Sequence, residues 1–432
     1  MAADEDDIKG LVFNEEIPEA THFPTEKVTE YGSTEQSLPG RLNIAGTSGA
    51  TDPGDDESHE EFIIAVFVVS FDTRKGNIIE WKYPECVKLT GVEFKALASG
   101  SHTVFKDFVY FKHGDNQFGL SCYERISVEN ENERGARMKS VGIICSKYTS
   151  LHEHMEFLED QVRFQLENPE SYESLMNYYN KFRVCRRKNN WLHSPQNVLG
   201  VEDLPFLKIT HPAGCFSQFL NFFGEKIFII WKLILLHRRI LFFSPPPVGI
   251  SCYRVYCACL LGSHSIPLSF ESGSINPLFF TNIFDIPYLG TEHKYIACTT
   301  EKIFESKSTL YDVYVDNQNI KCKPYLSSIQ YVNSYDKNRY NRLLDYRSNQ
   351  LLLNEGECVD DEKMYARFFA DLNNSLFQAL IDVASTRDKL LRSDAIREMG
   401  LDPKHDRIFL RELIELYGVE VPLENDSCCC IM

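Results

Sequence analysis

Three adjacent cysteines near the end of the sequence offer thiol chemistry. In the stretch DSCCCIM, Cys428 and Cys429 precede Cys430, Ile431 and Met432. A cysteine followed by two roughly apolar residues and a Met is the pattern that prenyltransferases read, and the Met favours a farnesyl group. We therefore predict a farnesyl group on Cys429 and a palmitoyl group on Cys428 as its reinforcement. A frayed tail without function and a metal or disulfide knot are the alternatives.

Two further groups contain the residue types that bind metals. His152 and His154 flank a glutamate in LHEHMEF, but a zinc-binding helix needs its second histidine four residues after the first, so we predict a solvated helix face. On a helix, Cys252, Cys257 and Cys259 cannot converge on one metal, because Cys257 is turned roughly 140° from Cys252. We predict that these thiols pack in the core, and we expect neither a metal nor another cofactor.

The common catalytic motifs are missing from the sequence. It contains no phosphate-binding GxxxxGK[ST] loop, no dinucleotide-binding GxGxxG and no GxSxG nucleophile elbow. We therefore expect no hydrolase, transferase or metal chemistry. No basic face of domain size is present either, which argues against nucleic acid as a partner.

The acidity of the chain is confined to its first segment. The net charge of the 432 residues is −17, and residues 1–61 hold 16 acidic and three basic residues, which leaves the remainder close to neutral. This segment has no apolar periodicity, so we predict that residues 1–60 are disordered. The acidic start resembles no secretory signal, and the 14 cysteines are then reduced thiols of a cytoplasmic protein. The apolar run 226–243 is too short to cross a bilayer. We expect peripheral membrane contact only through the lipidated tail.

The first folded block has the order of an α+β domain. The run 62–71 is rich in β-branched residues and 77–81 returns after a turn, which predicts a hairpin. Short strands follow at DFVYF, FGLSCYERI and RMKSVGIICS. Apolar residues then recur every three or four positions over 151–182, which predicts two helices separated at Asn168 and Pro169.

The second block alternates helices and strands, as an α/β sheet does. We predict a buried helix over 215–239, a strand at ILFFS, a helix over 249–262 that ends at Gly262, and strands at LFFT, YIACTT and LYDVYV. From about residue 324 the pattern is helical. Ser393 and Gly400 bound one short helix, and Asp402 with Pro403 marks the start of another.

Long stretches of the sequence resemble the DENN domain family over roughly residues 60–420. The matching strings are GVEFKALASGSH, ERGARMKSVGI, KITHPAGCFSQFLNFFGE, RRILFFSPPPVGISCYRVYCACLL, ACTTEKIFE, LYDVYVDNQN and MGLDPKHDRIFL. The resemblance implies a tripartite fold of mixed α+β and α/β class. Its three parts are a longin-like upstream lobe (61–183), a central α/β lobe (206–323) that follows a linker (184–205), and a mostly helical downstream lobe (324–424). The acidic tail (1–60) and the cysteine-rich tail (425–432) lie outside the resemblance.

The resemblance also implies a function. DENN proteins promote the exchange of GDP for GTP on small GTPases, most often of the Rab class, in membrane trafficking. The surface between the longin-like and central lobes is held responsible for this activity. We therefore expect Arg134, Arg137 and Lys139, in the string RGARMK, to border a GTPase-binding surface, with a solvated turn before a strand as the alternative. A non-catalytic adaptor that binds a GTPase or trafficking partner through the same fold is the other functional hypothesis.

Overall fold

The chain divides into two units, Met1–Glu57 and Ser58–Met432, and the computed structural model describes residues of the second. The described stretches are residues 62–129, 133, 135–183, 216–266, 277–353 and 361–424. The predictions for the acidic segment 1–60, the linker 184–205 and the tail 425–432 lie outside them, as do Arg134, Cys428 and Cys429.

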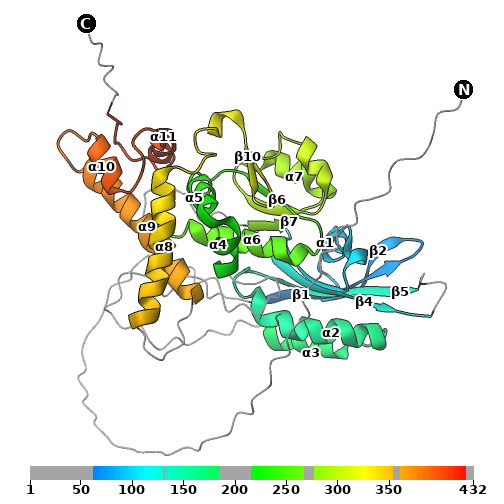
Figure 1. Ribbon diagram of the computed structural model, residues 1–432. Helices are drawn as coiled ribbons and strands as arrows, with labels where there is room; N and C mark the ends of the chain where they lie inside the picture. The colour runs from blue at the N-terminus through cyan, green and yellow to red at the C-terminus, as the bar shows by residue number, and fades with distance from the viewer. Residues whose placement is uncertain are drawn as a thin grey trace, which may run out of the picture. The chain divides into compact units, whose positions relative to one another are not determined.

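A mixed sheet of ten strands runs through the described part of the chain, in the order β10-β9-β6-β8-β7-β3-β4-β5-β1-β2 (Figure 1). The first five strands of the sequence are all antiparallel to one another where they pair. They are β1 (Ile63–Asp72), β2 (Gly76–Tyr83), β3 (Lys106–Lys112), β4 (Phe118–Ser127) and β5 (Ala136–Cys145). These strands and the first hairpin confirm the pattern read from the sequence.

The other five strands are mostly parallel, because β6 pairs in parallel with β8 and β9, and β7 does so with β8. They are β6 (Ile240–Phe243), β7 (Pro277–Phe280), β8 (Ile296–Thr299), β9 (Val313–Asp316) and β10 (Asn319–Cys322). The sequence predicted the first four of these but not β10, a short partner of β9. It also predicted two sheets, whereas antiparallel pairing of β3 with β7 joins them into one.

Helix α6 (Val248–Leu261) packs against β3, β7 and β8 and so lies on both halves of the sheet (Figure 1). It ends at Gly262, as predicted. Cys252 and Cys257 are buried, which confirms that they are core thiols, and the Cys252 sulfur lies 3.8 Å from the sulfur of Cys298 on β8.

The buried helix predicted over 215–239 is in fact two helices. α4 (Phe216–Phe223) and α5 (Ile227–Leu235) are separated by a turn of 3₁₀ helix, η4 (Gly224–Lys226), where the first residue has a positive φ of 55°. Every residue of α5 is buried. The arginines that were expected in its last turn follow the helix instead, and Arg239 forms an ion pair of 2.8 Å with Asp312 just before β9.

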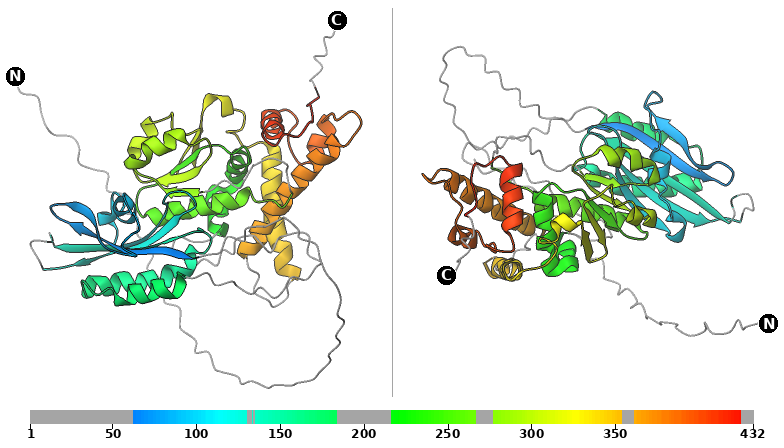
Figure 2. Two further views of the ribbon diagram at one scale, coloured as in Figure 1. Left: turned by 180° about the vertical axis from the view of Figure 1, so that it is seen from behind. Right: turned by 90° about the horizontal axis from the view of Figure 1, so that it is seen from above.

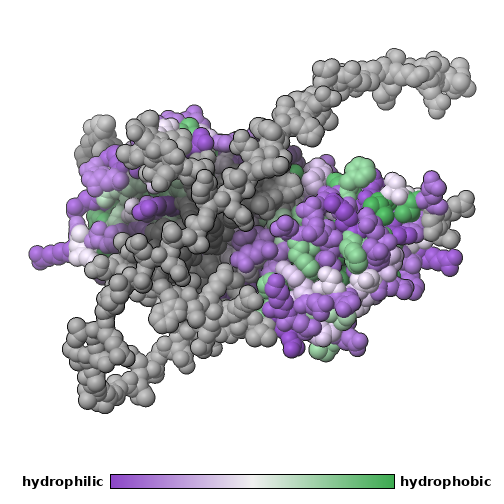
Figure 3. All heavy atoms as spheres, turned by 90° about the horizontal axis from the view of Figure 1, so that it is seen from below, coloured by the Kyte–Doolittle hydropathy of each residue, from purple (hydrophilic) through white to green (hydrophobic). Residues whose placement is uncertain are grey.

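Helices α2 (Met155–Glu167) and α3 (Glu173–Phe182) cover one face of the first five strands, with α2 against β4 and β5 and α3 against β1 (Figures 1 and 2). They are separated at Asn168 and Pro169, as predicted. Seen from the side of these helices, the coloured surface is mostly hydrophilic, with small separate hydrophobic areas (Figure 3).

His154 corrects the prediction of a solvated helix face. It is only 8% exposed, in the short 3₁₀ turn η3 (Leu151–His154) before α2, and its Nδ1 lies 2.6 Å from the hydroxyl of Tyr178 on α3. His152 is partly exposed, with its Nδ1 2.9 Å from the carbonyl of Thr149. Burial lowers the pKa of His154 to about 4. The two histidines thus serve local packing and hydrogen bonding.

The pKa of His154 predicts a loss of stability in acid. The imidazole takes up a proton near pH 6.5 when unfolded but only near pH 4 when folded, so its contribution to stability is present above pH 6.5 and is lost as the pH falls below it. We expect the free energy of unfolding to decrease by about 2 kcal/mol between pH 7 and pH 5 from this group. Urea denaturation of the wild type and of H154Q at both pH values measures this contribution. An equal change in both proteins would contradict it.

The last part of the described chain is helical and packs beside α4, α5 and α6 (Figures 1 and 2). Its helices are α8 (Ser334–Leu353), α9 (Asp361–Ala384), α10 (Ser393–Glu398) and α11 (Arg407–Leu416). The short helix predicted between Ser393 and Gly400 is confirmed as α10, but Ser393 is its first residue and not its cap, which is Arg392. The predicted start of α11 at Asp402 is wrong. The Asp402 carboxylate accepts hydrogen bonds from the backbone amides of Lys404 and His405 in a separate turn, and the helix begins after Asp406.

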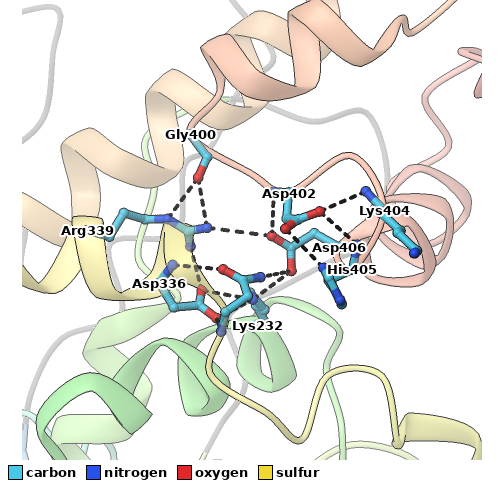
Figure 4. A network of polar contacts seen from close by, with 9 residues as sticks. Lys232, Asp336, Arg339, Gly400, Asp402, Lys404, His405 and Asp406 are labelled. Carbon is cyan, nitrogen blue, oxygen red and sulfur yellow. Dashed lines mark hydrogen bonds and ion pairs between the residues drawn. The ribbon is translucent and has the colours of Figure 1, made fainter.

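A buried network of charges joins α5 to α8 and α11 (Figure 4). The Lys232 ammonium lies 2.9 Å from the carboxylate of Asp336 and 2.7 Å from that of Asp406. Arg339 pairs with Asp336 at 3.4 Å, lies 3.8 Å from Asp406 and donates to the carbonyl of Gly400. Two cations and two anions therefore balance one another where water is excluded, as buried charges require.

Within the described stretches, no helix is both long and apolar enough to cross a membrane. The apolar run 226–243 forms α5 and β6 in the core.

Candidate functional site

Two neighbouring grooves lie where β1 to β5 and the segments between them adjoin residues 278–301, which we call the central part of the chain. The first has a volume of about 470 Å³ and the second about 360 Å³. Side chains from β1, helix α1 (Val92–Ala96), the loop after α1 and the segment after β7 line the first groove. Asn282 and Phe284 line both grooves, so the short turn η5 (Ile283–Asp285) stands between them.

Exposed aromatic side chains dominate the rims of these grooves. We call them the aromatic surface: Phe71, Phe94, Phe284 and Tyr288. Phe284 is 67% exposed, and its ring lies 4.8 Å from that of Phe94, centre to centre. A group of exposed aromatic rings around two neighbouring grooves, unlike a single exposed ring, is typical of a surface that contacts another protein.

The turn that carries Phe284 is held by its neighbours in sequence. The side chain of Asn282 accepts a hydrogen bond from the amide of Phe284, and the Asp285 carboxylate accepts one from the amide of Asn282. Both residues also reach the first part of the chain. Asn282 donates to the carbonyl of Phe94 at 3.3 Å, and Asp285 pairs with Lys95 at 2.9 Å. These contacts hold the two rings together across the junction.

Helix α1, which carries Phe94, is tied to the β1–β2 hairpin. It begins after Gly91, whose φ of 86° lies in the left-handed region that glycine adopts without strain. Asn77 of β2 donates its side-chain amide to the carbonyls of Glu93 and Leu97, one at each end of α1. The helix therefore moves with the hairpin.

The first groove also contains an acidic group. Burial raises the pKa of Glu301, the amide of Ile283 opposes this by donating to it, and the nearby Asp285 raises it further. Lys95 and Asp285, which pair with each other, line the second groove. Glu301 is the one carboxylate among the residues that line the first groove. Its walls are mainly apolar.

Arg137 and Lys139, the described residues among those predicted from RGARMK, line neither groove. Lys139 is only 4% exposed and pairs with Glu80 at 2.7 Å. Burial would raise the pKa of Glu80, but the hydrogen bonds from Lys139 and Tyr172 outweigh it, and the pKa is lowered. Arg137 donates to Glu133 and to the carbonyl of Leu166 at the end of α2. Both side chains thus point toward the side of the sheet that α2 and α3 cover.

Met138, between these two residues, lines the first groove instead. Successive side chains of a strand point to opposite faces. The exposure expected for Lys139 is therefore absent, and any role of Arg134, Arg137 and Lys139 in binding a partner stays a prediction.

The sequence contains a local signal for the turn that carries Phe284. In NIFD, an Asn is followed three residues later by an Asp, the spacing of a capping box, and the structure has this box at η5. Such a box fixes a turn and leaves the side chain between its two ends free to project outward. No comparable local signal marks the pairing of Phe284 with Phe94.

The described residues contain no group of three or more His, Cys, Asp and Glu side chains that could hold a metal ion. The aromatic surface also lacks a nucleophile beside a base. What the arrangement offers chemically is apolar contact area, with polar groups that fix its shape.

Comparison with known proteins identifies the family. The family model of DENN domain-containing protein 11 matches residues 66–325. The chain is 49% identical to DENN domain-containing protein 11 of Xenopus laevis over 386 residues, 86% of this chain and 87% of that protein. It is 46% identical to the Danio rerio protein of the same name over 95% of this chain and 87% of that one, and 47% identical to the Mus musculus protein over 91% and 86%. The predicted resemblance is thus confirmed, and the chain belongs to the DENN domain-containing protein 11 family.

Proposed function

We propose that this protein promotes the exchange of GDP for GTP on a small GTPase of the Rab class and that the aromatic surface contacts the GTPase. The observation that carries this proposal is the exposed Phe284, packed on Phe94 where the first five strands adjoin the central part of the chain. DENN domains generally act through a surface between the corresponding lobes. The proposal includes the predicted division into a longin-like lobe (61–183), a central lobe (206–323) and a downstream lobe (324–424).

Exchange of this kind requires no bond chemistry in the exchange factor. It requires tighter binding of the nucleotide-free GTPase than of the GDP-bound form, and each ~1.4 kcal/mol of that difference accelerates GDP release about tenfold. An aromatic ridge between two grooves suits this task. It can bury apolar side chains of the GTPase that become available when the nucleotide leaves.

Release of a fluorescent GDP analogue from a panel of purified Rab proteins tests the proposal. We expect the full-length protein to accelerate release from at least one of them. If none responds while a known DENN protein is active in the same assay, the proposed exchange activity is wrong. Tight binding to a GTP-loaded Rab, without any acceleration, would instead identify the adaptor that the sequence left open.

We further propose that the protein meets its GTPase on a membrane through lipids on Cys429 and Cys428. A single lipid chain of modest length binds only marginally, with an association constant of roughly 10⁴ M⁻¹, so a second chain is needed for stable anchoring. Mass spectrometry of the protein from eukaryotic cells should find farnesyl on Cys429 and the last three residues removed, and should find neither change in C429S. An intact, unmodified Met432 tail in the wild type would contradict this.

A further inference from the structure

The first half of the sheet (β1 to β5) and the second half (β6 to β10) are joined by very little backbone pairing. Within the described strands, the register of β3 with β7 consists of one residue pair, Phe111 with Phe279. On its other side β3 pairs with β4 along its full length, from Lys106 to Lys112. Phe279 has a φ of 56°, in the left-handed region that is strained for a residue with a large side chain. The backbone at this joint is therefore short and strained.

One carboxylate spans the joint. Asp107 of β3, only 6% exposed, accepts hydrogen bonds from the amides of Val248 at 2.5 Å and Gly249 at 3.0 Å, in the first turn of α6. It also accepts one from the amide of Phe108. The residue before α6 is Pro247, which provides no side-chain cap. Strand β3 of the first half of the sheet thus caps α6, a helix that follows β6 of the second half in sequence and packs against both halves.

Among the described residues, the groups that act on the buried Asp107 carboxylate are the backbone amides of Gly249, Val248 and Phe108, with no cation among them. Tyr123 of β4 is the register partner of Asp107 and so lies on the same face of the sheet. The thiols of Cys122 on β4 and Cys298 on β8 also interact with the carboxylate electrostatically, as the Tyr123 hydroxyl does. Burial raises the pKa of all three, which keeps them neutral. The backbone amides at the start of α6 are therefore its main compensation for burial.

Movement at this joint would change the aromatic surface. Phe94 belongs to α1, which is tied to the hairpin of the first half. Phe284 lies in η5, which follows β7 after only two residues. Two contacts connect α1 with the segment after β7: the ion pair between Lys95 and Asp285, and the hydrogen bond from Asn282 to the carbonyl of Phe94. A rotation of β7 against β3 would therefore move one ring relative to the other.

We propose that the β3–β7 pairing is a hinge, here called the articulation, about which the two halves of the sheet rotate. The hydrogen bonds from the amides of Val248 and Gly249 to Asp107 hold the two halves together. The articulation sets the distance between Phe94 and Phe284. Its role in partner binding rests on the proposed function, but the articulation itself does not.

Hydrogen–deuterium exchange of the full chain at neutral pH, without any GTPase, tests this inference. In D107A the amides of Val248 and Gly249 lose their acceptor, and we expect them and residues 279–285 to exchange at least about tenfold faster. D107N is the milder variant. Its remaining oxygen can still accept from Gly249, while its NH₂ group faces the amide of Val248, so Val248 should accelerate more than Gly249. D72N is the matched control, since Asp72 accepts from two amides of its own turn, those of Arg74 and Lys75.

The residues whose amide exchange becomes faster decide between the possible outcomes. Faster exchange at Val248 and at residues 279–285, with β4 and β5 unchanged and no effect of D72N at the joint, supports the articulation. A change limited to Val248 and Gly249 would make Asp107 a helix cap and nothing more. An equal increase in β4 and β5 would also overturn the inference, because the whole core would then be loosened. Neither negative result bears on GDP release, which the Rab panel measures separately.

Discussion

Replacing Phe284 with Asp should reduce the acceleration of GDP release by about 100-fold or more for any Rab on which the protein acts. Phe284 is the most exposed ring of the aromatic surface, so the substitution should leave the free protein folded. In the complex, the same position would place a charge in an apolar contact. The loss of an aromatic anchor alone commonly costs about 2–4 kcal/mol of binding free energy, and an unpaired buried carboxylate adds to that cost.

A matched control is available elsewhere on the protein. Tyr331 is 71% exposed, lies between β10 and α8, and contacts neither groove of the aromatic surface. Y331D should therefore accelerate the release of GDP from the Rab protein as much as the wild type does. Thermal unfolding of both variants would show that the folded state is retained. If F284D accelerates GDP release as strongly as Y331D does, the GTPase binds elsewhere and the aromatic surface is not its site.

Replacing Lys232 with Met should lower the free energy of unfolding by about 3–5 kcal/mol. Met preserves most of the volume, but Asp336 and Asp406 would then share one remaining cation, Arg339, and one negative charge would be uncompensated in the interior. The effect is large because these four side chains are buried between α5 and the helices that follow (Figure 4). Urea denaturation at neutral pH measures it.

Two further variants separate charge balance from packing. K232M combined with D336N restores neutrality, so we expect the double variant to be more stable than K232M alone. R392M removes an exposed ion pair with Asp388, which should cost less than about 1 kcal/mol. A loss in K232M no greater than that in R392M would mean that the buried network adds little to stability.

The sequence by itself determined most of the elements and the family. The run of β-branched residues in β1, the change from strand to helix period after residue 150 and the glycines that end α6 and α10 all act over a few residues, so they could be recognised without the structure. The strings that resemble the DENN domain family, such as MGLDPKHDRIFL, identified the family in the same way. One error lies where two local signals competed, at Asp402, whose carboxylate caps a turn one helical turn before α11 begins.

Only the tertiary structure decided which distant residues meet. Lys232 is separated by 104 residues from Asp336 and by 174 from Asp406, and Asp107 by 141 from Val248. The same holds for the joining of two predicted sheets into one, and for the pairing of Phe94 with Phe284. Local patterns report the face of a helix or strand on which a residue lies, as the alternation at Arg137, Met138 and Lys139 illustrates. They do not report what covers that face, because that depends on how the whole chain packs.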